Sequence, residues 1–131
     1  MTAKTHRVRF DPVGIEIEVS EDETILEGGF RSGLMLMHGC KEGQCSACKS
    51  FMIEGEIDLE RYSTFALADY EKEEGYTLLC RAHAYSDLVV ELINYDEEML
   101  TSGVPIQIVK TVVEAIEPLT RDIRQLVLRL V

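Results

Sequence analysis

Hydrophobic and polar residues alternate strictly near the start of the chain, and this alternation predicts β-strands. In the stretch GIEIEVS, at positions 14–20, isoleucine and valine alternate with glutamate and serine. The preceding stretch THRVRF, at positions 5–10, is joined to it through Asp-Pro-Val-Gly. Because the side chains of a strand point alternately to its two faces, we expect two paired strands with one buried face and one acidic face.

A helix is predicted directly after this pair. Ser20 and Glu23 have the spacing of a capping box, which satisfies free N–H groups at the start of a helix. Gly33 follows at a position typical of a helix end. The face expected to pack against the sheet consists of Ile25, Leu26, Gly29 and Phe30.

Shorter elements are predicted in the middle of the chain. KSFMIEGE reads as a strand with Phe51 and Ile53 on one face and a turn at Gly55. STFALADYEKEEG predicts a short helix from about Phe65, ended by Gly75. After the segment YTLLC, the alternation in DLVVELI predicts a final strand. This order of elements predicts a mixed sheet crossed by one principal helix, an α+β fold.

The C-terminal part has a different pattern. NYDEEMLTSGVPIQ contains Asp, Ser, Gly and Pro and reads as a connector. Beyond it, IVKTVVEAI and RQLVLRLV predict two further strands, and the chain stops inside an apolar run. We therefore expect one domain over residues 1–95, a linker over 96–106 and the cut start of a second domain over 107–131.

Composition and charge limit the partners. The chain of 131 residues is 46% hydrophobic and 28% charged, as in soluble globular proteins, and its net charge is −11. Such a charge repels phosphate groups, which argues against nucleic acid and anionic membranes and favours a basic protein partner. No apolar run approaches the roughly 20 residues of a membrane span, and no signal peptide is visible. We therefore expect a cytoplasmic protein with no membrane partner.

Four cysteines carry the candidate chemistry. In the cytoplasm thiols stay reduced, so four cysteines are more typical of metal ligands or catalytic groups than of disulfides. Cys40, Cys45, Cys48 and Cys80 form a C-x4-C-x2-C motif followed, after 31 residues, by a fourth cysteine. This is the plant-type spacing of a [2Fe–2S] cluster, in which each of two irons takes two thiolates.

The residues around the first three cysteines suit a loop that wraps a cluster. Glycine permits unusual backbone angles, small side chains leave room for amides to point at sulfur, and a lysine can offset cluster charge. The supporting residues expected on these grounds are Gly39, Lys41, Gly43, Ser46 and Ala47.

Three other sites use similar residues. Four cysteines can hold structural zinc, but such sites usually pair two C-x2-C arms, and here the second arm is a single cysteine. A thioredoxin-like dithiol would open a helix, whereas a strand is predicted after Cys48. A Rieske centre would use His38 and His83 and leave two cysteines unexplained. We interpret both histidines as loop or surface residues near the site.

The sequence also resembles a known family. From about Val8 to Ile93, through CKEGQCSACKS and LLCRA, it resembles plant-type [2Fe–2S] ferredoxin domains with the β-grasp fold. More narrowly, STFALADYEKEEGYTLLCRAHAYSDLVVEL and IVKTVVEAIEPLTRDIRQLVLRL resemble reductase components of bacterial multicomponent di-iron monooxygenases. These include the phenol hydroxylase, alkene or propane, and soluble methane monooxygenase systems. Lys41 stands where many ferredoxins have arginine.

The resemblance implies a function for the chain and its parent. The cluster would pass single electrons from FAD, reduced by NADH, to the di-iron hydroxylase. The tail would begin the FAD-binding domain, and the FAD and NADH sites would lie beyond Val131. The chain alone would be an electron carrier and the parent an NADH-dependent oxidoreductase. A ring-hydroxylating dioxygenase or a cytochrome P450 as client, and a zinc-binding module, are the alternatives.

Overall fold

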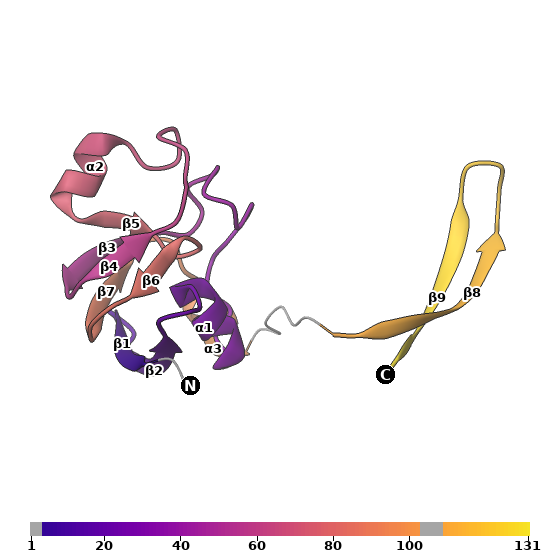
Figure 1. Cartoon of the computed structure of the whole chain (residues 1–131), viewed down its shortest axis with the longest axis horizontal. Helices are drawn as coiled ribbons and strands as arrows, with labels where there is room; N and C mark the ends of the chain where they lie inside the picture. Colours follow the sequence, from indigo (N-terminus) through magenta and orange to yellow (C-terminus); the bar gives the residue numbers. More distant parts are fainter. Residues whose placement is uncertain (1–3, 103–108) are drawn as a thin grey trace.

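The computed structural model describes residues 4–102 and 109–131. Its main feature is a five-stranded mixed sheet in the order β2-β1-β7-β3-β5 (Figure 1). These strands are β1 Thr5–Asp11, β2 Ile15–Ser20, β3 Lys49–Glu54, β5 Tyr76–Leu78 and β7 Leu88–Leu92. β1 and β7 are parallel, and the other neighbours are antiparallel. The predicted α+β architecture is confirmed, with the mixed sheet of a β-grasp ferredoxin-like fold.

The first two strands follow the predicted alternation. In β2, Ile17 and Val19 are buried while Glu16 and Glu18 are exposed. In β3 the core-facing residues are Ser50 and Met52. Phe51 and Ile53 therefore lie on the opposite face of β3, where Phe51 makes an edge-to-face contact with Tyr76.

The predicted helix is present as α1, Ile25–Arg31, but its cap is not the predicted one. Thr24 caps the helix in a capping box with Glu27. The Ser20 and Glu23 pair has the same spacing, and the Ser20 amide does donate to the Glu23 carboxylate. The intervening residues form a turn, so that bond closes the turn and starts no helix.

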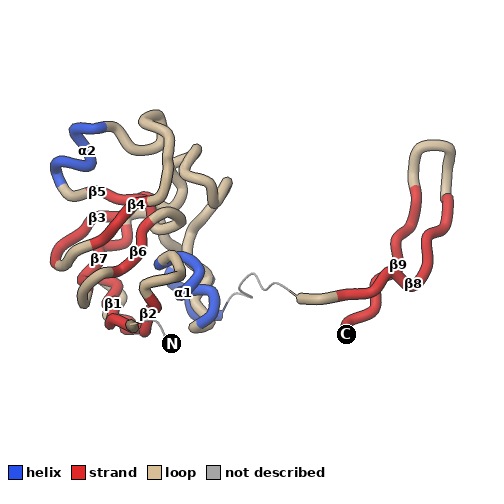
Figure 2. Tube along the Cα trace, in the orientation of Figure 1, coloured by secondary structure: helices blue, strands red, loops and turns tan. Residues whose placement is uncertain are grey.

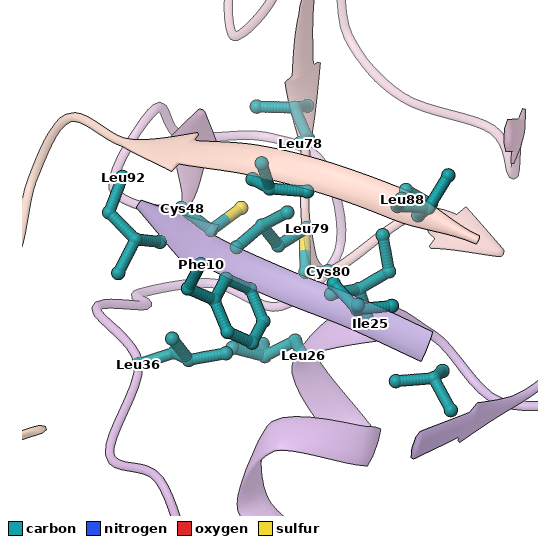
Figure 3. Packing of buried hydrophobic residues seen from close by; sticks show 14 of the residues in the cluster. Phe10, Ile25, Leu26, Leu36, Cys48, Leu78, Leu79, Cys80, Leu88 and Leu92 are labelled. Carbon is teal, nitrogen blue, oxygen red and sulfur yellow. The ribbon is translucent and has the colours of Figure 1, made fainter. Parts of the chain in front are cut away.

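Glycine allows α1 to lie close to the sheet. A Cβ at Gly28 would lie 2.7 Å from the Val19 side chain of β2. The buried side chains Ile25 and Leu26 join Phe10 and Leu36 in the core, as Figure 3 shows. The core therefore holds the helix in place despite the low helix propensity of glycine.

Three short strands were not predicted, and one of them is β5, at the edge of the five-stranded sheet. β4, Ile57–Leu59, pairs antiparallel with β6, Ala82–Ala84. Strands of three residues are too short to show a clear alternation, which explains why the sequence pattern missed them.

The second helix, α2, spans Asp69–Glu74 and begins later than predicted. The amides of Ala66 and Leu67 donate to the Ser63 carbonyl, and the Phe65 amide donates to the Ser63 hydroxyl. These bonds form a single turn, and α2 starts only after it because Ala68 has extended backbone angles, with φ of −71° and ψ of 154°. The predicted end is confirmed, because Gly75 has φ of 114° at the C-cap.

A third helix, α3, Glu97–Ser102, lies inside the segment that the sequence suggested as a connector. Leu100 is buried, and its carbonyl accepts a hydrogen bond of 3.0 Å from the Met35 amide. Leu100, together with Tyr95 packed against the core, therefore anchors this segment. The boundaries expected at residues 95 and 106 remain a prediction.

The last two strands form a hairpin, β8 Thr111–Pro118 and β9 Arg124–Leu130 (Figure 2). Both predicted strands are confirmed in the described part of the chain, and the start of IVKTVVEAI lies outside it. Many of the apolar side chains of the hairpin are exposed; those with at least half of their surface exposed include Val113, Ile116, Leu126, Leu128 and Leu130. In the described residues, no helix is both long and apolar enough to cross a membrane.

Candidate metal centre

The structure brings the four predicted cysteines together in two pairs. Cys40, Cys45 and Cys48 lie in the loop between α1 and β3, and Cys80 directly follows β5 and Leu79. The Cys40 amide lies 3.5 Å from the Cys45 sulfur, and the Cys45 amide lies 3.3 Å from the Cys40 sulfur. The Cys48 and Cys80 thiols hydrogen-bond to each other. All four thiols are free.

Backbone amides surround the Cys40 sulfur. The amides of Glu42, Gln44 and Cys45 donate to it over 3.3, 3.2 and 3.3 Å. The hydrogen bond from Glu42, followed by the others, lowers the pKa of Cys40 to about 7. Hydrogen bonds to the charged form stabilise it, so this loop favours a thiolate at Cys40. A thiolate is the form that binds metals.

The loop reaches this arrangement through two residues in the left-handed region. Lys41 has φ of 61° and Gly43 has φ of 74°. Lysine rarely adopts this conformation, and glycine adopts it freely. The chain therefore curls around the Cys40 sulfur, with successive N–H groups directed at it.

Close contacts explain why the residues at positions 39 and 43 are glycines. A Cβ at Gly39 would lie 2.9 Å from the Cys45 sulfur. A Cβ at Gly43 would lie 2.7 Å from the Tyr62 Cβ and 3.1 Å from the Arg81 Cγ. The absence of a side chain at Gly39 leaves space beside the Cys45 sulfur, and its absence at Gly43 allows Tyr62 and Arg81 to lie against the loop.

The second pair lies deeper. Cys48 and Cys80 belong to the buried hydrophobic core, and Figure 3 shows both next to Leu79. The hydrogen bond from Cys80, together with backbone hydrogen bonds, lowers the pKa of Cys48 to about 7. The same hydrogen bond raises the pKa of Cys80, because it favours the protonated thiol there. The two thiols thus share a proton that a metal would displace.

The remaining predicted loop residues have distinct surroundings. The Ser46 hydroxyl donates to the Ala66 carbonyl over 3.1 Å, which ties the loop to the turn before α2. Ala47 would be 3.6 Å from a Cβ on Gly39. The Lys41 side chain lines a cavity with Cys80 and Arg81.

Both histidines interact with groups other than the cysteines. His38 Nδ1 lies 2.8 Å from the Leu36 carbonyl, and its ring contacts Phe30 edge-on. His83 Nδ1 lies 2.9 Å from the Glu21 carbonyl, and its Nε2 lies 2.8 Å from Glu60. These contacts agree with the interpretation of the two imidazoles as neighbours of the site.

The arrangement suits a group with two metal atoms. Within residues 4–102 and 109–131, no three His, Cys, Asp or Glu side chains surround a position for one metal ion. Two pairs of cysteines can each serve one iron of a [2Fe–2S] cluster, which uses four thiolates. Nothing in the geometry favours the zinc alternative, whose ligands would converge tetrahedrally on one ion.

Sequence reasoning missed the segment that supports the loop from outside. The Ser63 amide donates to the Gly43 carbonyl over 2.7 Å, and Tyr62 lies against Gly43. The Arg81 side chain also lies against this glycine. No local pattern indicates these contacts, because they join residues about twenty to forty positions apart.

Comparisons with known proteins agree with this geometry. A family model described as the 2Fe-2S iron-sulfur cluster binding domain matches residues 8–85. The propane 2-monooxygenase reductase component of Mycolicibacterium smegmatis is 59% identical over 127 residues, which are 97% of this chain and 36% of that protein. The phenol 2-monooxygenase reductase component of a Pseudomonas species is 37% identical over 127 residues, covering 96% of this chain and 35% of that protein.

A solved structure gives the same picture. Phthalate dioxygenase reductase, described as a modular structure for electron transfer from pyridine nucleotides to [2Fe–2S], is 28% identical with a TM-score of 0.56. The match covers 70% of this chain and 27% of that one. The chain spans about a third of the length of the two monooxygenase reductase components that it matches.

Proposed function

The chain belongs to the family of 2Fe-2S iron-sulfur cluster binding domains, and on that premise we propose that Cys40, Cys45, Cys48 and Cys80 are the ligands of the cluster. The observation that carries this proposal is the arrangement of the four thiols in two pairs. In one pair, the Cys40 sulfur accepts hydrogen bonds from three backbone amides. When bound, such a cluster accepts and returns one electron at a time.

The protein's own groups prepare the site for the cluster. The amides around Cys40 stabilise a thiolate and offset part of its negative charge. Hydrogen bonds to ligand sulfur and the degree of solvent exposure are the two main means by which a protein adjusts a cluster's potential. Cys40 and Cys45 are partly exposed while Cys48 and Cys80 are buried, so one end of the site faces solvent. Electrons would enter and leave at that end.

In the full-length parent, we propose that these electrons come from FAD reduced by NADH and go to the di-iron hydroxylase of a bacterial monooxygenase. Support comes from the relatives, which are reductase components of propane and phenol monooxygenases. The chain by itself would carry electrons without oxidising NADH. The proposed location is the cytoplasm, where the four free thiols would stay reduced.

The domain boundaries belong to the same proposal. Residues 1–95 would be the ferredoxin domain, 96–106 the linker, and 107–131 the start of an FAD-binding domain. The hairpin β8–β9 supports this division, because a lone two-stranded hairpin is marginally stable and this one has many exposed apolar side chains. Further strands of a second domain would cover them.

The hydroxylase would dock beside the turn that supports the cysteine loop. Phe65 is 97% exposed on this turn, and the bonds from Ser46 and Ser63 hold the turn against the loop. The adjoining helix α2, with the sequence DYEKEE, carries four acidic residues and one lysine. An exposed aromatic residue beside acidic side chains suits a partner with an apolar pocket and a basic rim.

The ligand assignment is tested by iron and sulfide analysis of cysteine variants. Wild-type protein should contain two irons and two acid-labile sulfides per chain. Cys45→Ala and Cys80→Ala each remove one ligand and should lose most of the visible absorbance. Met37→Ala, which changes an exposed residue outside the ligand set, serves as the control. Wild-type iron and absorbance in either cysteine variant would refute the assignment.

A further inference from the structure

Arg81 has an unusual environment for a charged side chain. It directly follows Cys80, and its side chain is 22% exposed. Its Nε–H is buried and has no hydrogen-bond partner. A buried donor without a partner costs free energy, and an incompletely paired buried charge costs more. The fold therefore holds a cation at this position, and the surrounding protein groups pair with its charge only in part.

The stem of Arg81 lies against the cysteine loop. Its Cγ would be 3.1 Å from a Cβ on Gly43, the glycine between Cys40 and Cys45. Arg81 and its neighbour Cys80 both line one cavity together with Lys41.

The nearest carboxylate neutralises Arg81 incompletely. Arg81 Nη1 lies 3.6 Å from Glu60 Oε1, which is beyond ordinary hydrogen-bond length. The other oxygen of Glu60 lies 2.8 Å from His83 Nε2, so this carboxylate is shared.

Arg31, which lines the same cavity, provides a contrast. It bonds Glu23 over 2.6 and 3.2 Å and also donates to the Glu18 carbonyl. Of the two arginines, Arg81 is the one whose charge is incompletely paired, and it lies beside a cysteine.

We infer that the positive charge of Arg81 acts on the iron–sulfur cluster and favours its reduced state. This inference rests on the proposed cluster site. The reduced cluster carries one more negative charge than the oxidised one, so a nearby cation stabilises it more. A partly buried charge is screened less by salt and water than an exposed one, which makes the effect larger than that of a surface lysine. Arg81 therefore raises the potential of the cluster.

The test is the midpoint potential of the cluster, measured by spectroelectrochemistry on purified variants. Arg81→Gln should shift the one-electron equilibrium toward the oxidised cluster by about tenfold, which corresponds to about 59 mV. Arg81→Lys keeps the charge and should stay within about threefold of wild type. The matched control is Arg31→Gln, which removes a cation already paired with Glu23 and should also stay within about threefold.

A second pair of variants tests the inference if Arg81→Gln does not hold its cluster. Glu60→Gln removes the carboxylate that partly neutralises Arg81, and Glu23→Gln removes the partner of Arg31. The first should favour the reduced cluster at least threefold more than the second. Equal shifts in these two variants would overturn the inference.

The outcomes also separate this inference from the proposed function. An unchanged potential in Arg81→Gln, with a wild-type visible spectrum, would overturn the role of Arg81 and leave the cluster assignment intact. A wild-type protein with no reducible cluster would remove both.

Discussion

The Ser46 hydroxyl donates a hydrogen bond of 3.1 Å to the Ala66 carbonyl. Ser46 lies between two cysteines of the loop, and Ala66 is a fully buried residue of the turn before α2. This bond, with the one from the Ser63 amide to the Gly43 carbonyl, fixes the loop to a turn that is distant in sequence. The cysteine loop therefore depends on the turn for its shape, and so does the placement of Phe65.

Removing the Ser46 hydroxyl should loosen the loop. We expect Ser46→Ala to lower the free energy of unfolding by about 1 kcal/mol, the usual contribution of one such hydrogen bond. The cluster should also be lost faster in the presence of an iron chelator. Urea denaturation and the decay of visible absorbance measure the two effects. Ser32→Ala, at the end of α1 and outside the loop, is the control, and equal decay rates in the two variants would contradict this account.

A side chain at Gly39 should interfere with the site more than with the fold. In Gly39→Ala the added Cβ would lie 2.9 Å from the Cys45 sulfur, so the loop must shift. We expect iron content per chain to fall by at least half. Gly33→Ala is the matched control, because its Cβ meets no atom and its φ of 88° costs about 1–2 kcal/mol of folding stability. Normal iron content in Gly39→Ala would contradict the prediction.

The pH dependence of stability should report the contact between His83 and Glu60. Burial lowers the pKa of His83, but the hydrogen bonds to Glu60 and the Glu21 carbonyl and the nearby Glu27 charge outweigh it, so the net pKa is raised. Because the folded pKa is above the unfolded value of about 6.5, protonated His83 adds stability that is fully present below that pH. This stability is lost as pH rises through the folded pKa.

We therefore expect His83→Gln to destabilise the protein more at a pH of about 6 than at about 8.5. Glu60 is 45% exposed, so the difference should be within about 1 kcal/mol. Urea denaturation at the two pH values measures it, and Glu60→Gln should show a loss of the same sign. A larger effect at the higher pH would show that the sign is wrong.

Phe65 should matter for the partner and not for the cluster. Its side chain is 97% exposed, so Phe65→Ala should leave the cluster's potential and the protein's stability unchanged. Loss of a central aromatic contact costs at least about 1–2 kcal/mol of binding, so electron transfer to the hydroxylase at limiting concentration should slow about tenfold. Stopped-flow kinetics with the purified hydroxylase measures the rate. Tyr85→Ala, an exposed aromatic residue near the end of β6, is the control. An unchanged rate for Phe65→Ala would exclude docking at this turn.

The sequence predicted the parts of this fold that have a strong local signal. The alternation in β2 and the left-handed glycine that ends α2 depend on neighbouring residues alone. The N-terminus of α1 was assigned to the wrong cap because Ser20 with Glu23 and Thr24 with Glu27 have the same spacing. In the structure the cap is Thr24, and the helix that follows it buries Ile25 and Leu26.

The candidate site divides in the same way. Three of the cysteines lie close together in the sequence, so their spacing is a local signal. The fourth is predicted as a ligand because a [2Fe–2S] cluster needs four thiolates. The role of Arg81 has no local signal, because its environment is set by Gly43 and Glu60, residues from two other segments. The start of α2 has no local signal either, because Ala68 is extended there although alanine has a high helix propensity.

We expect this domain to hold one [2Fe–2S] cluster and to carry one electron. The most direct test is the visible absorption of the anaerobically purified chain during titration with dithionite, with EPR on the reduced sample. We predict a coloured oxidised form that bleaches after uptake of one electron per chain and gains an EPR signal that reoxidation removes. A colourless, EPR-silent protein that contains one zinc ion per chain would contradict the account.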